Sequence, residues 1–141
     1  MDAELRHEAK ILSTVRVIAV VGCSRNEGKP SYDIPAYMQR EGFRIIPVNP
    51  NAESILGEKC YKRLSDIPFK VDIVDVFRPS SEALAITKEA FEAGVMKVWL
   101  QLGIYSEEAA AYAASKSMEI VMNRCIMVEY NKIKDDISTR S

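Results

Sequence analysis

The sequence contains a single histidine, His7, and this scarcity limits the catalytic chemistry that the chain can support. A Ser-His-Asp triad needs a histidine held between a nucleophile and a carboxylate, at a site where a substrate binds. His7 lies near the N-terminus in a charged segment, far along the chain from every loop considered below. We therefore expect no catalytic residues of this kind.

Cysteine is also scarce, because Cys23, Cys60 and Cys125 are odd in number and widely separated. No CxxC pair occurs, so the sequence indicates neither a disulfide framework nor a zinc site. The chain shows no signal-peptide pattern and no run of the roughly 18–20 apolar residues that a membrane span requires. We expect a cytoplasmic protein without a bound metal.

An excess of one charge is lacking as well, since 19 Lys and Arg residues face 20 Asp and Glu residues and the net charge is −1. No long block of one sign occurs, which argues against a membrane anchor or a nucleic-acid partner. A length of 141 residues is typical of one domain, so we expect residues 1–141 to fold as a single domain.

What the sequence does contain is a regular alternation of apolar runs and amphipathic segments. A short apolar run that ends at a glycine or a turn predicts a buried strand, whereas three- and four-residue spacing predicts a helix. We expect strands at 16–21, 44–48, 71–77, 97–100 and 119–122. We expect helices at 4–14, 32–41, 80–93, 106–116 and 126–132, the second capped by Ser31. The segment 52–68 is expected to be irregular, with one turn of helix around 64–67.

Strands that alternate with helices predict an α/β fold with a parallel sheet. We expect a Rossmann-like, doubly wound sheet of five strands in the order 3-2-1-4-5, with helices on both faces. Such sheets bind ligands beyond the carboxyl ends of the strands, where the strand order reverses. Five loops are predicted to lie at that edge: 22–31, 49–51, 77–79, 101–103 and 123–125.

The loop after the first strand has the composition of an anion-binding site. Gly22 lets the backbone turn tightly, and Ser24, Arg25 and Lys29 supply donors and positive charge beside a helix N-terminus. The second glycine of G-x-G-x-x-G and the GK[ST] of a P-loop are both missing. The loop is therefore either a pyrophosphate site of another type or a solvated turn.

The second strand is followed by Asn49 and Pro50, where NAD-binding domains place an acidic residue against the ribose hydroxyls. An amide avoids repulsion with a phosphate on that ribose, which coenzyme A carries at the 3′ position and NADP at the 2′ position. The same two residues are also common in simple turns.

Three residues at the strand ends each have two interpretations. Arg78 can bind a phosphate or form a surface ion pair, and Phe77 can stack on a base or pack at the core edge. Cys23, beside Arg25 and a helix N-terminus, is either a thiol of lowered pKa or a small apolar residue. A mixed disulfide with a cofactor thiol is conceivable at Cys23 or at Cys125.

Six segments together resemble the CoA-binding domain family of small stand-alone proteins. They are VVGCSRNEGKPSY, IIPVNPN, ILGEKCYKRLSDIP, VDIVDVFRPS, VWLQLGIYSEEA and VMNRCIMVEY, within about residues 8–133. This domain is similar to the CoA-binding domain of succinyl-CoA synthetase α-subunits and of ADP-forming acyl-CoA synthetases. Synthetases of the succinyl-CoA type transfer phosphate through a histidine in another domain, so the resemblance implies CoA binding without catalysis by this chain.

The resemblance also implies which residues bind the cofactor. The pyrophosphate would contact the first loop, at Gly22, Cys23, Ser24, Arg25, Lys29 and Pro30. The adenosine end would lie against Asn49, Pro50, Phe77, Arg78 and Pro79. The pantetheine arm would pass Gln101 and Gly103, and the family's closing motif is matched by Asn123, Arg124 and Cys125.

The ligand implied is CoA or an acyl-CoA, with a homodimer or an acyl-CoA-metabolising enzyme as the protein partner. The apolar residues of 126–133 are compatible with a dimer surface and equally with a core. Two alternatives remain: an NAD(P)-binding enzyme or sensor on the same fold, and a subunit that completes an acyl-CoA synthetase in trans.

Overall fold

A computed structural model describes the backbone of residues 3–140 and the side chains of residues 7–135. The parallel strands are β1 (Val17–Val21), β2 (Arg44–Val48), β5 (Ile73–Val76), β6 (Lys97–Leu100) and β7 (Glu119–Val121). The helices are α1 (Ala3–Ser13), α2 (Pro30–Arg40), α3 (Ala83–Glu92), α4 (Glu107–Ser115) and α5 (Ile126–Arg140). Short elements are β3 (Ser54–Ile55), β4 (Glu58–Lys59), η1 (Leu64–Asp66) and η2 (Ser80–Glu82).

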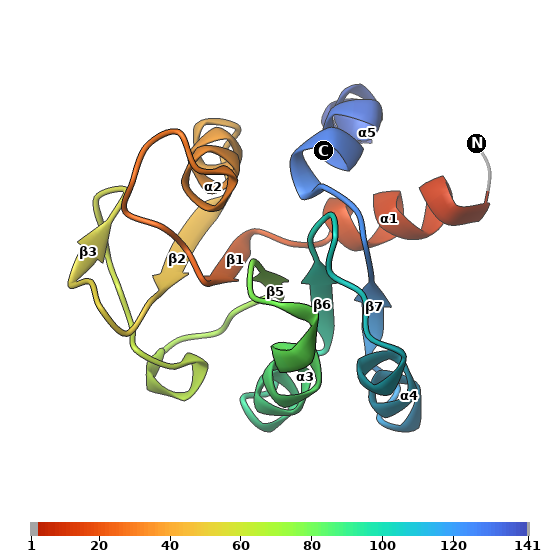
Figure 1. The fold of residues 1–141 in the computed structure, drawn as a ribbon. Coiled ribbons are helices and arrows are strands. Elements are labelled where there is room, and N and C mark those ends of the chain that lie inside the picture. The colour runs from red at the N-terminus through yellow and green to blue at the C-terminus, as the bar shows by residue number, and fades with distance from the viewer. Residues whose placement is uncertain (1–2, 141) are drawn as a thin grey trace.

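The five strands form one sheet in the order β2-β1-β5-β6-β7, and all neighbouring pairs are parallel (Figure 1). Tyr61 forms an isolated parallel bridge with Val48, which also pairs with β1 on its other side. Numbered along the chain, the five strands lie in the order 2-1-3-4-5, because β5, the strand expected over 71–77, pairs directly with β1. When the Tyr61 bridge is counted as a further position beyond β2, the order matches the expected 3-2-1-4-5 pattern, and β7 follows.

Helices cover both faces of the sheet, as the alternation predicts. Helices α1, α2 and α5 lie on one face, and α3 and α4 lie on the other (Figure 1). Side chains alternate along β1, so that Ile18 and Val20 enter a first buried cluster while Ala19 enters a second. Two apolar layers therefore hold the sheet, which is typical of strands buried on both faces.

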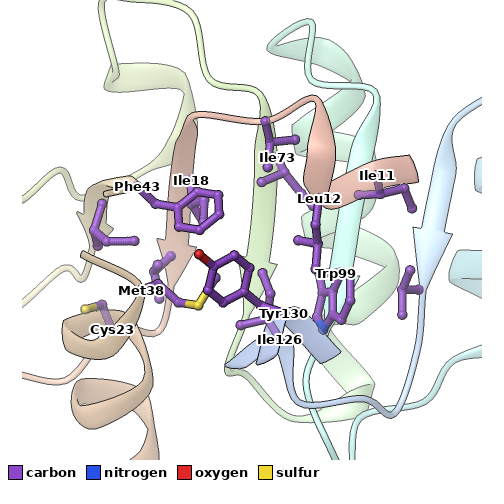
Figure 2. Close-up of a cluster of buried hydrophobic side chains, with 14 of the residues drawn as sticks. Ile11, Leu12, Ile18, Cys23, Met38, Phe43, Ile73, Trp99, Ile126 and Tyr130 are labelled. Atoms are coloured by element: carbon purple, nitrogen blue, oxygen red, sulfur yellow. The ribbon is translucent and has the colours of Figure 1, made fainter. Parts of the chain in front are cut away.

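The first cluster lies under α1, α2 and α5, and Figure 2 shows part of it around Leu12, Trp99 and Tyr130. Trp99 is fully buried and donates a hydrogen bond from Nε1 to the carbonyl oxygen of Arg124, 2.9 Å away. The rings of Phe43 and Tyr130 pack edge to face with centroids 5.2 Å apart. These contacts fix α5 on the sheet and so fix the ends of β6 and β7.

Three local expectations need correction. Helix α2 begins at Pro30 with Lys29 as its N-cap residue, so the prediction of Ser31 as the cap is wrong. Proline takes the first helical position because its fixed φ suits a helix and its missing N–H has no partner there. The segment 52–68, expected to be irregular apart from one helical turn, contains the antiparallel β3–β4 hairpin, whereas the expected turn near 64–67 is present as η1.

Helix α5 is longer than expected, since it continues to Arg140 instead of ending near 132. The first cluster contains the buried side chains of Ile126, Tyr130 and Ile133. Packing of this apolar face stabilises the helix beyond residue 132. Most of the apolar residues of 126–133 are thus core residues, although Val128 is exposed. Within residues 3–140, no helix has the length and hydropathy of a membrane span.

Candidate functional site

A cavity of about 670 Å³ lies at the carboxyl ends of β1, β2 and β5. The strand order reverses at this point, because β2 lies on one side of β1 and β5 lies on the other. A cavity of this size suits a cofactor. Nine of the fourteen residues predicted from the sequence line it: Gly22, Cys23, Ser24, Arg25, Lys29, Asn49, Pro50, Phe77 and Arg78. The other five do not: Pro30, Pro79, Gln101, Gly103 and Asn123.

Gly22 brings the end of β1 close to the end of β5. Its φ is +87°, and a Cβ added there would lie 2.8 Å from Cδ of Arg78 and 2.9 Å from the carbonyl oxygen of Phe77. The Gly22 N–H also donates to the carbonyl oxygen of Val48, 3.1 Å away. The glycine is therefore required by close contact within the protein, besides any approach of a ligand.

The loop between β1 and α2 is held by its own hydrogen bonds. Ser24 Oγ accepts from the Asn26 N–H at 3.0 Å, and the Ser24 N–H donates to the carbonyl oxygen of Ser31 at 3.1 Å. Arg25 Nη1 donates to the carbonyl oxygen of Asn51 at 3.4 Å, across the cavity mouth. The loop thus presents its polar groups from an ordered backbone.

Asn49 connects two strand-end loops. Its Nδ2 donates to the carbonyl oxygen of Cys23 at 2.9 Å, and its Oδ1 accepts from the Asn51 N–H at 2.8 Å. The second bond is a side-chain turn of the kind that asparagine commonly forms. Asn49 therefore serves as a turn residue while it lines the cavity with an uncharged group.

Arg78 and Glu82 form an ion pair on the cavity wall. Nη2 of Arg78 lies 2.8 Å from Oε2 of Glu82, Nε lies 3.2 Å from Oε1, and both side chains are about half exposed. Such exposed pairs stabilise a fold only slightly. Phe77 lines the cavity and also packs against the first buried cluster, so both of its interpretations fit the structure.

Cys23 is fully buried, in the same cluster as Met38 (Figure 2). Burial, with smaller contributions from the nearby Cys60 and Asp75, raises the pKa of its thiol to about 12. Of the two interpretations of Cys23, the thiol of lowered pKa is wrong, because desolvation disfavours the thiolate more than a helix N-terminus favours it. Cys23 is a small, buried apolar residue of the cavity lining.

Gln101, Gly103 and Asn123 form hydrogen bonds that hold the loops at the ends of β6 and β7. The Gly103 N–H donates to Asn123 Oδ1 at 2.7 Å, and Gln101 Oε1 accepts from the Ile126 N–H at 3.1 Å. Gln101 therefore caps the N-terminus of α5, and Asn123 adopts a φ of +58°. These residues fix loops beside the cavity, and their contact with a pantetheine arm stays a prediction.

Sequence reasoning missed part of the cavity wall, namely Lys62, Arg63, Leu64, Ile86 and Glu89. The first three belong to a segment expected to be irregular, which the bridge at Tyr61 brings to the edge of the sheet. The available signal is the adjacent Lys62-Arg63 pair within ILGEKCYKRLSDIP, one of the six segments that carry the family resemblance.

Asp75 was not among the predicted site residues, because it lies within the central strand β5 and not in a loop after it. It pairs there with Val20 of β1 and Trp99 of β6. It is almost completely buried, and its Oδ1 has no hydrogen-bond partner in the described part of the chain. Burial raises the pKa of this carboxyl well above its ordinary value. Asp75 is thus a buried acid near the site, outside the cavity lining.

The cavity is chemically suited to a polyanion. Four cations line it in addition to Arg78, namely Arg25, Lys29, Lys62 and Arg63, against the two carboxylates of Glu82 and Glu89. His7 is exposed on α1 and takes no part in the lining. Among residues 3–140 no group of three or more side chains is arranged as a metal site.

Residues 16–131 match the family described as the CoA binding domain. The uncharacterized protein YneT of Bacillus subtilis is 36% identical over 121 residues, which is 86% of this chain and 90% of that protein. A hypothetical protein from Pyrococcus horikoshii has a solved structure with a TM-score of 0.86 and 33% identity, over 94% of this chain and 91% of that one.

The ADP-forming acetate–CoA ligase II of Archaeoglobus fulgidus is 37% identical over 93 residues, or 64% of this chain. Those residues are 14% of the ligase, so the similarity concerns one section of a much longer protein. The family match spans the loops that build the cavity, from Gly22 to Arg78. The chain therefore belongs to the CoA binding domain family.

Proposed function

We propose that this chain binds coenzyme A, or an acyl-CoA, in the cavity at the carboxyl edge of the sheet, and that it does so as one domain without catalysis of its own. The observation that carries the proposal is a cation-lined cavity at the switch point of a sheet whose family is that of the CoA binding domain. CoA carries a diphosphate and a separate 3′-phosphate, so it matches a site with several cations.

The loop between β1 and α2 is the proposed pyrophosphate site. Arg25 and Lys29 supply positive charge there, and Ser31 lies at the N-terminus of α2, where the helix dipole favours an anion. Asn49 supports CoA over a plain nicotinamide dinucleotide, because it offers no carboxylate to a ribose that carries a phosphate. Phe77 lines the same cavity and is the proposed contact for the adenine.

The similarity to one section of an acetate–CoA ligase supports an acyl-CoA-metabolising enzyme as the protein partner. Three free cysteines favour a reducing compartment, and we propose the cytoplasm. A partner that completes a synthetase in trans would co-purify with the chain and would show ligase activity only in the mixture.

Thermal unfolding in the presence of ligands tests the proposal. A ligand that binds only the folded state raises stability by about 2.7 kcal/mol at 100 times its Kd. We expect CoA or acetyl-CoA to raise the Tm in a concentration-dependent way, with NAD and ATP giving little shift and no acetyl-CoA being consumed. A shift with NADP and none with CoA would contradict the proposed ligand.

A further inference from the structure

The cavity carries cations on two separate walls. Arg25 and Lys29 belong to the loop that leads into α2, on one side of the sheet. Lys62 and Arg63 precede η1, whose Leu64 packs in the second cluster on the opposite side. The loop of Asn49 and the following residues lies between the two walls at the end of β2. A ligand that spans both walls meets two distinct cationic sites.

The wall of Lys62 and Arg63 is anchored on both sides. The Tyr61 N–H donates to the carbonyl oxygen of Pro47 at 3.0 Å, and the Tyr61 carbonyl accepts from the Asn49 N–H at 2.9 Å. On the other side, the Leu64 N–H donates to Glu89 Oε1 at 2.9 Å, and Leu64 is buried. The backbone that carries the two cations is thus fixed against β2 and α3.

Lys62 and Arg63 differ from Arg78 in their ion pairing. Arg78 is paired with Glu82, whereas within the described side chains no carboxylate lies within ion-pair distance of Lys62 or Arg63. Glu89 lines the same cavity, and its Oε1 accepts a hydrogen bond from the Leu64 backbone N–H. Two adjacent cations that face a cavity without a partner are suited to a dianionic group.

We infer that Lys62 and Arg63 bind the 3′-phosphate of coenzyme A and make the site selective for CoA over 3′-dephospho-CoA; this inference rests on the proposed function. With the diphosphate on the wall of Arg25 and Lys29, the ribose lies over the end of β2. Its phosphate then faces the second cationic wall. A phosphate monoester carries about −1.5 to −2 charges at neutral pH, which two cations balance.

The test compares two ligands on two variants. CoA and 3′-dephospho-CoA are titrated by calorimetry into the wild type and into the double variant Lys62→Ala, Arg63→Ala, at low ionic strength where charge effects are largest. The matched control is Lys10→Ala with Lys70→Ala, which removes two exposed cations that do not line the cavity. Circular dichroism and thermal unfolding establish that each variant is folded.

We expect the wild type and the control to bind CoA at least about tenfold more tightly than 3′-dephospho-CoA, and the Lys62, Arg63 variant to lose that difference by weakening for CoA alone. Equal wild-type affinities for the two ligands would overturn the inference while leaving CoA binding in place. A variant that weakens equally for both ligands would also overturn it. If the wild type binds neither ligand, the proposed function and this inference fail together.

Discussion

Asn49 donates a hydrogen bond from Nδ2 to the carbonyl oxygen of Cys23, 2.9 Å away, and so joins the end of β2 to the end of β1. The same side chain accepts from the Asn51 N–H through Oδ1. Both ends of the amide are therefore used within the protein, at the edge of the proposed ribose site. Asn49 thus holds together two loops that line the cavity.

Replacing Asn49 separates its structural role from its electrostatic role. Asn49→Ala removes both hydrogen bonds and should lower the free energy of unfolding by about 1–3 kcal/mol in urea titrations. Asn49→Asp keeps an acceptor for the Asn51 N–H but places a carboxylate at the ribose position, so it should weaken CoA binding more than Asn49→Ala does. Asn51→Ala keeps the backbone N–H and is the control. Equal CoA affinity in the two Asn49 variants would contradict the charge argument.

Gly22 and Gly28 form a matched pair for testing close contact. Both have positive φ, +87° and +92°, but only at Gly22 would a Cβ approach other atoms, including Cδ of Arg78 at 2.8 Å. Gly28→Ala should cost about 1–2 kcal/mol for its φ alone. Gly22→Ala should cost more, because the end of β5 must also shift. Similar losses in the two variants, measured by chemical unfolding, would show that the contact is unimportant.

Burial of Asp75 predicts a pH dependence of stability. Burial raises the pKa of this carboxyl, so the folded state keeps a proton that the unfolded chain releases above its ordinary pKa of about 3.9. Stability should therefore be greatest below that pH and fall as the pH rises toward the folded-state pKa, by up to about 1.4 kcal/mol per pH unit.

Asp75→Asn keeps the size of the side chain and removes the ionisation. Urea unfolding at several pH values should show a shallower fall of stability with rising pH in this variant than in the wild type. Asp66→Asn, at an exposed position, should leave the wild-type slope unchanged. If Asp75→Asn and the wild type follow the same pH profile, Asp75 ionises freely in the folded state.

The thiols should differ in reactivity. Burial raises the pKa of Cys23 to about 12 and also raises the pKa of Cys60, whereas Cys125 is only half-buried. Alkylation with iodoacetamide at pH 8, followed by mass spectrometry, should modify Cys125 first and reach Cys23 only on unfolding. Rapid modification of Cys23 in the folded protein would restore the hypothesis of a reactive thiolate there.

Local patterns were enough to predict the elements that build the sheet. The strands expected at 44–48 and 97–100 have those bounds in β2 and β6, because each is an apolar run ended by a turn. The start of α2 was open to the same local reasoning, because Pro30 suits the first helical position. The end of α5 was not, because it depends on packing of Tyr130 and Ile133 in the tertiary core.

The site residues also divide into those that local patterns predict and those that depend on long-range pairing. Residues directly after β1, β2 and β5 were found because every parallel strand ends at the same edge of the sheet. Gln101 and Asn123 also follow strands, but those strands lie beyond β5, away from the cavity. Lys62 and Arg63 follow no long strand, and a single bridge at Tyr61 places them there. Long-range pairing of this kind leaves little trace in a single sequence.

Calorimetric titration of the reduced protein with CoA tests the central claim most directly, with NAD, NADP and ATP as comparison ligands. We expect selective binding of CoA in the micromolar range, about −8 kcal/mol, and a loss of at least about tenfold in the variant Arg25→Ala, Lys29→Ala. Absence of CoA binding, or unchanged CoA affinity in that variant, would contradict the assignment of the cavity as the site for the CoA pyrophosphate.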